Sequence, residues 1–238
     1  MAVLNYLEGI SLHAPDAPLF RNIISLRESE DLMDDLSDVP EERDAAHRLE
    51  MQTKPHPYGD RERIIQRPFD EADWFNAIQF PFEHWQASRF SEGRHGVWYG
   101  AGDLDTTVYE TCYHWRSGLL ADAGWESLTG VSVERSVYHV DCKASLLDFT
   151  QASDLHADLR HPSSYGVTQD IGRQIHREGH PGLISLSARC DGLTYAVFNP
   201  EVLSNPANYC YLTYTMDAGA VIVERAPGET LLSVPFAM

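Results

Sequence analysis

The sequence predicts a single α+β domain over residues 1–238, with an N-terminal helical insertion. Two observations lead to this class. Short apolar stretches typical of strands alternate with segments typical of helices, and no linker separates two hydrophobic cores. A chain of 238 residues, 43% hydrophobic and 23% charged, is long enough and apolar enough to bury a substantial core.

The first predicted strand covers residues 17–26 (APLFRNIISL) and carries Arg21 in its middle. Residues 27–85 then form a long segment that is mostly helix and loop in pattern. Within it the sequence predicts a helix over 30–37 capped by Ser29, a helix after Pro40 through Leu49, and a loop over 53–59. The aromatic-rich end of the insertion, residues 70–85, is expected either to cover a cleft or to pack in the core.

Two helices and six strands are predicted after the insertion. Asp105 is the expected N-cap of a helix over 106–116 that carries Glu110, and Gly179 is expected to end a helix over 168–178. The predicted strands cover residues 97–99, 131–140, 145–149, 182–187, 194–198 and 209–214.

The net charge of −18 excludes several classes of partner. Nucleic acids are polyanions, and no run of Lys and Arg offers them a basic face. No apolar stretch is long enough to span a bilayer, and residues 1–12 lack the basic start and apolar run of a secretory signal. We therefore expect a cytoplasmic protein with no direct nucleic-acid or membrane partner, and buried thiols rather than disulfides.

Arg89 and Tyr99 are the first candidate site residues. Arg89 precedes a glycine-bearing turn, where its planar guanidinium could bind two phosphate oxygens, although a surface arginine in an ion pair also fits. Tyr99 ends an apolar run and precedes Gly-Ala-Gly, where small residues let a flat ligand approach. A core tyrosine with a bonded hydroxyl fits that position too.

Glu110 and Ser187 are the second pair of candidates. Glu110 lies in an otherwise apolar helical stretch, VYETCYHW, where a carboxylate needs a paired cation or a functional role. Such a carboxylate can stabilise the positive charge that develops when a glycosidic bond breaks. The alternatives are a glutamate on a helix surface and, for Ser187, an ordinary turn serine at the end of a buried strand.

Other kinds of site find little support in the sequence. The four cysteines form no CxxC pair, and Gly179 and Pro181 flank His180, so His176 and His180 are not expected to form a helical metal-binding pair. No metal site is therefore expected. The sequence has no GxSxG, no GxGxxG and no Walker loop, so NAD would not be held in the Rossmann manner.

The stretch SRFSEGRHGVWYGAGDLDTTVYETCYHW, residues 88–115, resembles the central motif of the RES-domain family. That family is named for an arginine, a glutamate and a serine, which correspond here to Arg89, Glu110 and Ser187. The later segments GLISLSAR and AVFNPEVLS resemble its second motif, with Leu186 in place of the usual proline. Arg21, in PLFRNI, resembles the arginine of the family's N-terminal strand. Longer members of the family have an insertion after this strand, and residues 27–85 resemble that insertion.

The resemblance implies a fold similar to ADP-ribosyltransferase toxins, with NAD as substrate rather than cofactor. It also implies the toxin of a toxin–antitoxin system, blocked by an Xre-like antitoxin. The family's implied activity is NAD phosphorylase or glycohydrolase, with inorganic phosphate or water as acceptor. In that interpretation Arg21, Arg89, Tyr99 and Ser187 bind NAD, and Glu110 stabilises the ribose cation.

Two alternatives stay open at this point. The protein could transfer ADP-ribose to a protein target, or to a nucleic-acid acceptor. It could also be a binding module without activity, although keeping Arg89, Tyr99, Glu110 and Ser187 together disfavours that.

Overall fold

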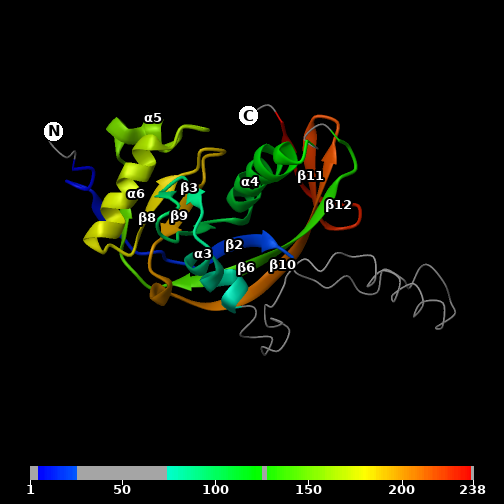
Figure 1. Ribbon diagram of the computed structural model, residues 1–238. Coiled ribbons are helices and arrows are strands. Elements are labelled where there is room, and N and C mark those ends of the chain that lie inside the picture. The colour runs from blue at the N-terminus through cyan, green and yellow to red at the C-terminus, as the bar shows by residue number, and fades with distance from the viewer. Residues whose placement is uncertain (1–4, 26–73, 125–127, 237–238) are drawn as a thin grey trace, which may run out of the picture. The chain divides into compact units, whose positions relative to one another are not determined.

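The computed structural model describes residues 5–25, 74–124 and 128–236 (Figure 1). The chain divides into two compact units, one of residues 1–24 and 69–238 and one of residues 25–68. The predicted helices over 30–37 and through Leu49, and the loop over 53–59, lie outside the described residues, as does most of the 27–85 insertion.

A ten-stranded sheet organises the first unit, in the order β1-β7-β8-β9-β5-β2-β6-β10-β11-β12. Its neighbours pair antiparallel except for β7 and β8, which are parallel. The strands are β1 (Ser11–His13), β2 (Leu19–Ile24), β5 (Trp98–Ala101), β6 (Ser132–Cys142), β7 (Leu146–Asp148), β8 (Gly182–Leu186), β9 (Leu193–Val197), β10 (Leu203–Asp217), β11 (Ala220–Ala226) and β12 (Glu229–Pro235). A small hairpin of β3 (Ala87–Ser88) and β4 (Ser91–Glu92) stands apart from this sheet.

Two longer helices pack on the sheet, α4 (Leu104–His114) and α6 (Gly166–Glu178) (Figure 1). A π-helical segment, η3 (Trp115–Leu120), continues α4. The shorter helical segments are η2 (Phe75–Gln79), α3 (Phe80–Glu83), η4 (Ser153–Leu155), α5 (His156–Leu159) and η5 (Pro200–Val202). In the described part of the chain, no helix is both long and apolar enough to cross a membrane.

The structure confirms the mixed α/β class and every strand that the sequence predicts, although β10 begins six residues before the predicted 209–214 and ends three residues after it. It also confirms the end of α6 at Gly179, which adopts the left-handed conformation with φ 76°. The predicted cap of α4 is wrong: Asp103, not Asp105, accepts the backbone N–H of Thr106 and starts the helix two residues earlier. The β11–β12 hairpin is an element that the sequence analysis did not predict.

Three apolar clusters hold the elements together. Ile171 and Ile175 of α6 pack on Leu183, and α4 buries Val108 and Cys112 against β6, β10 and β11. Burying each large aliphatic side chain contributes about 1.5–3 kcal/mol. In the third cluster Ala77 and Ile78 of η2 pack on Trp98, so this part of the 70–85 segment packs in the core, whereas Trp74, Phe80 and Trp85 are exposed. The Trp98 indole N–H also donates to the Ala77 carbonyl at 2.7 Å.

Candidate active site

The turn between β8 and β9 packs against the first turn of α4. Its closing hydrogen bond runs from the backbone N–H of Ser187 to the carbonyl of Gly192, at 2.8 Å. A Cβ on Gly192 would overlap the side chain of Thr106, so glycine lets the turn approach the helix this closely. This approach brings the end of β8 to the face of α4 that carries Glu110.

Glu110 and Ser187 meet at this contact. The Ser187 Oγ donates to Glu110 Oε1 at 2.5 Å and accepts the backbone N–H of Arg189 at 2.9 Å. Ser187 is 1% exposed, whereas the Glu110 side chain is 22% exposed. One carboxylate oxygen is therefore fixed by a buried hydroxyl while the group stays accessible to a ligand. The other oxygen, Oε2, lies 3.9 Å from Nε2 of His114, one turn further along α4.

Tyr99 supports the hairpin that carries Arg89. Its hydroxyl donates to Ser88 Oγ at 2.8 Å and accepts the backbone N–H of Phe90 at 3.0 Å. Burial of the hydroxyl raises the pKa of Tyr99 to about 12, although both hydrogen bonds oppose the shift. The phenol is therefore protonated at neutral pH, and its hydroxyl is used to hold the two residues that flank Arg89.

Arg89 lies in the turn between β3 and β4, with its guanidinium over the ring of Tyr165 at 4.6 Å. Its Nη1 donates to the carbonyls of Leu159 (3.1 Å) and His161 (2.9 Å). Desolvation lowers the pKa of Arg89 from its ordinary 12.5, while the nearby Glu110 carboxylate opposes that shift. Nε and Nη2 make no hydrogen bond with any residue that the structure describes.

Arg21 contacts Tyr99, one of the other four candidates, through the Tyr99 backbone, and lies away from Glu110 on α4. In β2, side chains alternate between the two faces of the sheet, so Arg21 leaves from the face opposite Phe20. Phe20 packs with α4, whereas the Arg21 guanidinium lies 5.5 Å from the Trp98 ring and donates to the Tyr99 carbonyl at 2.7 Å. Burial lowers the pKa of Arg21 to about 10, with a further lowering from Arg135. The structure therefore gives Arg21 a place in the packing between β2 and β5.

Three neighbours of the site were not singled out from the sequence. Arg189 follows Ser187 by two residues and lies with its guanidinium over the Tyr113 ring at 3.2 Å. Tyr165 stacks on Arg89, and His114 faces Glu110. The Ser-x-Arg spacing at the end of the predicted strand was the available signal for Arg189, and the i, i+4 spacing from Glu110 was the signal for His114.

The site concentrates positive charge around one carboxylate. The pKa of His114 is lowered from 6.5, first by desolvation, and the guanidiniums of Arg189 and Arg89 add to this lowering while Glu110 opposes it. Arg189 likewise lowers the pKa of Arg89. These mutual effects place the four groups within electrostatic reach of one another, which gives a local positive field in a chain of net charge −18.

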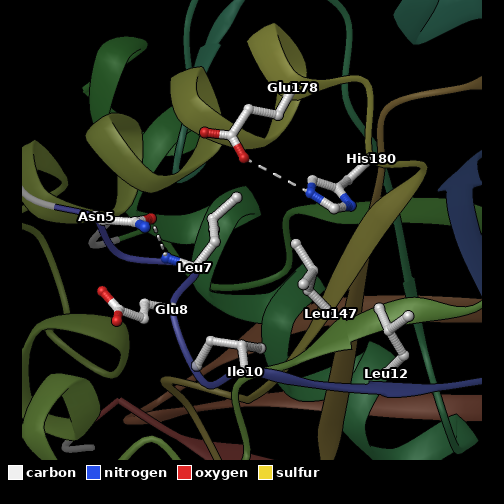
Figure 2. A pocket seen from close by; sticks show the side chains of 8 residues that line it. All are labelled: Asn5, Leu7, Glu8, Ile10, Leu12, Leu147, Glu178 and His180. Atoms are coloured by element: carbon white, nitrogen blue, oxygen red, sulfur yellow. Dashed lines mark hydrogen bonds and ion pairs between the residues drawn. The ribbon is translucent and has the colours of Figure 1, made fainter.

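A separate cavity of about 310 Å³ lies beside the N-terminal segment (Figure 2). Eight residues line it: Asn5, Leu7, Glu8, Ile10, Leu12, Leu147, Glu178 and His180. None of the candidate site residues is among them. Its lining of four aliphatic and four polar side chains, with no arginine, also differs from the arginine-rich surroundings of Glu110.

The geometry combines a fixed, accessible carboxylate with two guanidiniums, which suits a ligand that carries both a phosphate group and a centre of developing positive charge. In the described residues no group of three or more His, Cys, Asp and Glu side chains is arranged to hold a metal ion.

Comparison with known proteins identifies the chain. The family model described as RES domain matches residues 60–217, which include Arg89, Tyr99, Glu110 and Ser187. No curated protein matches the chain. Among solved structures, the crystal structure of the M. tuberculosis MbcT-MbcA toxin-antitoxin complex is similar, with 14% identity and a TM-score of 0.38 over 51% of this chain and 71% of that one. Since the family model covers well over half of its length, the chain belongs to the RES domain family.

Proposed function

We propose that this protein binds NAD and breaks its nicotinamide–ribose bond, with phosphate or water as acceptor. The observation that carries the proposal is the 2.5 Å hydrogen bond that fixes the Glu110 carboxylate, with Arg89 within electrostatic reach. Membership of the RES domain family supports it. The assignment of the family's arginine, glutamate and serine to Arg89, Glu110 and Ser187 rests on the resemblance of the motifs that carry them.

Glu110 acts on the ribose in this mechanism. As the glycosidic bond breaks, positive charge develops on the ribose ring, and an oriented carboxylate nearby lowers the energy of that state. Ser187 holds Oε1, so that the carboxylate does not have to reorganise when the charge appears. Ser187 is thus a positioning residue, and Glu110 is the residue that faces the reacting sugar.

The bond chemistry needs no strong acid. The C1′–N bond breaks with its electron pair going to the nicotinamide ring, which leaves as a neutral molecule from a cationic one. An oxygen of phosphate or water then bonds to C1′, and a water acceptor releases its proton to solvent. The guanidinium of Arg89 binds phosphate oxygens through the donors it does not use on Leu159 and His161.

The proposal extends to the biological setting. We propose an ADP-ribosyltransferase-like fold for the domain, a cytoplasmic location, and an Xre-like antitoxin that blocks the toxin by covering the site. The single-domain organisation over residues 1–238 is part of the same proposal.

The test compares NAD consumption by the parent protein and by Glu110→Gln, which keeps the shape of the side chain and removes its charge. Loss of a preorganised electrostatic group costs about 10²–10³ in rate. The matched control is Glu201→Gln, an exposed glutamate in η5, which should consume NAD at the parent rate. A Glu110→Gln protein as active as the parent would show that the carboxylate does not serve the chemistry.

A further inference from the structure

Arg189 has the features of an unassigned ligand-binding residue. Its backbone N–H bonds the Ser187 hydroxyl at 2.9 Å, so it follows directly from the group that orients Glu110. Its guanidinium lies over the Tyr113 ring at 3.2 Å, and its Nη2 donates to the Pro162 carbonyl at 2.6 Å. The side chain is thus held from two sides and has little freedom to leave the site.

One donor of Arg189 is left without a partner. Its Nε is buried and makes no hydrogen bond to any group in the described part of the chain. A buried N–H without an acceptor is costly, and such groups in folded proteins usually have an explanation. An acceptor supplied by a ligand would remove this cost.

Arg89 and Arg189 both donate hydrogen bonds to the backbone of residues 161–162. Arg89 donates to the His161 carbonyl and Arg189 donates to the carbonyl of the next residue, Pro162. The two accepting carbonyls belong to adjacent residues, and Arg189 lowers the pKa of Arg89, so the two guanidiniums lie near each other. Each guanidinium uses one terminal nitrogen on this segment, Nη1 of Arg89 and Nη2 of Arg189. Its other N–H groups can donate to a ligand.

Two neighbouring guanidiniums repel each other, and one carboxylate, Glu110, lies within their reach. A dianionic group between them would offset this repulsion, and its tetrahedral oxygens match the two-donor edge of a guanidinium. Lysine could supply the charge, but it has no equivalent of the Nε–H edge.

We propose that Arg189 and Arg89 together form a phosphate-binding subsite beside Glu110, with the 159–162 carbonyls holding both guanidiniums in position. The proposal rests on the proposed function, for which it names the second cationic residue. The phosphate group is either part of the dinucleotide diphosphate or inorganic phosphate, since both present the same oxygens to the two arginines.

The experiment measures binding to the full chain by calorimetry, with two probes: inorganic phosphate and ADP-ribose. Arg189→Gln should weaken at least one probe by about tenfold or more, and Arg189→Lys should weaken it less. The matched control is Arg177→Gln, at the exposed end of α6, where the arginine pairs with Glu178. This control should bind both probes as the parent does.

The two probes separate the two sources of phosphate. Weakening of inorganic phosphate alone assigns the subsite to the acceptor, and weakening of ADP-ribose assigns it to the diphosphate. Unchanged affinity for both probes in Arg189→Gln overturns the proposal, as does a parent protein that binds neither. If the glutamine variant does not fold, Arg189→Lys decides the question, because it keeps the charge and loses the Nε–H edge: affinity equal to that of the parent for both probes then overturns the proposal.

The binding readout is independent of catalysis. Parent protein that binds ADP-ribose through Arg189 but leaves NAD intact would contradict the proposed function and leave the subsite standing. If the parent protein cleaves NAD and Arg189→Gln binds both probes as the parent does, the proposed function stands and the subsite is contradicted.

Discussion

Replacing Ser187 with alanine removes the hydroxyl that orients Glu110. Two hydrogen bonds are lost: the 2.5 Å bond to the carboxylate and the 2.9 Å bond from the backbone N–H of Arg189. Because Ser187 is 1% exposed, water does not readily replace them. Removing a buried partner of a charged group and leaving a donor unpaired costs about 1–3 kcal/mol of unfolding free energy.

The expected effect on activity is larger than the effect on folding. If the freed carboxylate loses about 1.4–2.8 kcal/mol of transition-state stabilisation, the rate of NAD loss falls about 10- to 100-fold. Urea unfolding measures the first effect, and the initial rate of nicotinamide release measures the second. Both are measured under conditions in which the variant remains folded.

Ser185→Ala is the matched control for this experiment. Ser185 lies on the same strand, is also 1% exposed, and its hydroxyl lies 3.1 Å from the hydroxyl of Thr194 rather than near the carboxylate. It should lose comparable stability and keep its activity. The reasoning is refuted if folded Ser187→Ala releases nicotinamide at the parent rate, or if Ser185→Ala loses as much activity as Ser187→Ala does.

Three further predictions concern the helices and the histidine. A Cβ on Gly172 would overlap the carbonyl of Phe90, so Gly172→Ala should lower the free energy of unfolding by about 1–3 kcal/mol, and an unchanged urea midpoint would contradict the close packing of α6. Asp103→Ala removes the N-cap of α4 and should cost about 1 kcal/mol, with Asp103→Asn nearly neutral; equal losses in the two variants would argue against a capping role. Desolvation lowers the pKa of His114 below its ordinary 6.5, so its imidazole is mostly neutral at pH 7 and becomes half protonated only at a pH below 6.5. An imidazolium 3.9 Å from the Glu110 carboxylate would compete with the ribose cation for its charge, so the rate of NAD loss should fall as the pH drops below 6.5. His114→Gln should reduce this fall in rate, and a pH profile identical to that of the parent would count against the role of His114.

Local patterns predicted the elements whose causes are local. The end of α6 follows from Gly179, because a left-handed residue after a helical pattern is a short-range signal. The start of α4 was placed two residues late because the sequence DLDTT offers two aspartates of equal capping preference. The hydrogen bond from Thr106 to Asp103, which depends on the path of the preceding chain, decides between them.

Long-range pairing limited the prediction of the fold. The position of β2 between β5 and β6 joins segments more than 70 residues apart, and no local signal encodes that register. The β11–β12 hairpin was not predicted, although two glycines with positive φ mark the turns around β11: Gly219 between β10 and β11, and Gly228 between β11 and β12.

In the candidate site, too, local motifs could be predicted from the sequence and long-range contacts could not. The family motifs identified Arg89, Glu110 and Ser187, and the match to the RES domain model confirms the family. The sequence could not show that Ser187 bonds Glu110, because this contact spans 77 residues and depends on the close approach at Gly192. Nor could it show that Arg21 packs against the backbone of β5, since that depends on the pairing of β2.

The central claim is that the protein cleaves the nicotinamide–ribose bond of NAD. The most direct measurement incubates the purified full chain with NAD, with and without inorganic phosphate, and identifies the products by mass. The account predicts free nicotinamide in both cases, together with ADP-ribose in water and, where phosphate is the acceptor, a phosphorylated ADP-ribose. NAD that keeps its mass under both conditions, or ADP-ribose found only on a protein, would contradict it.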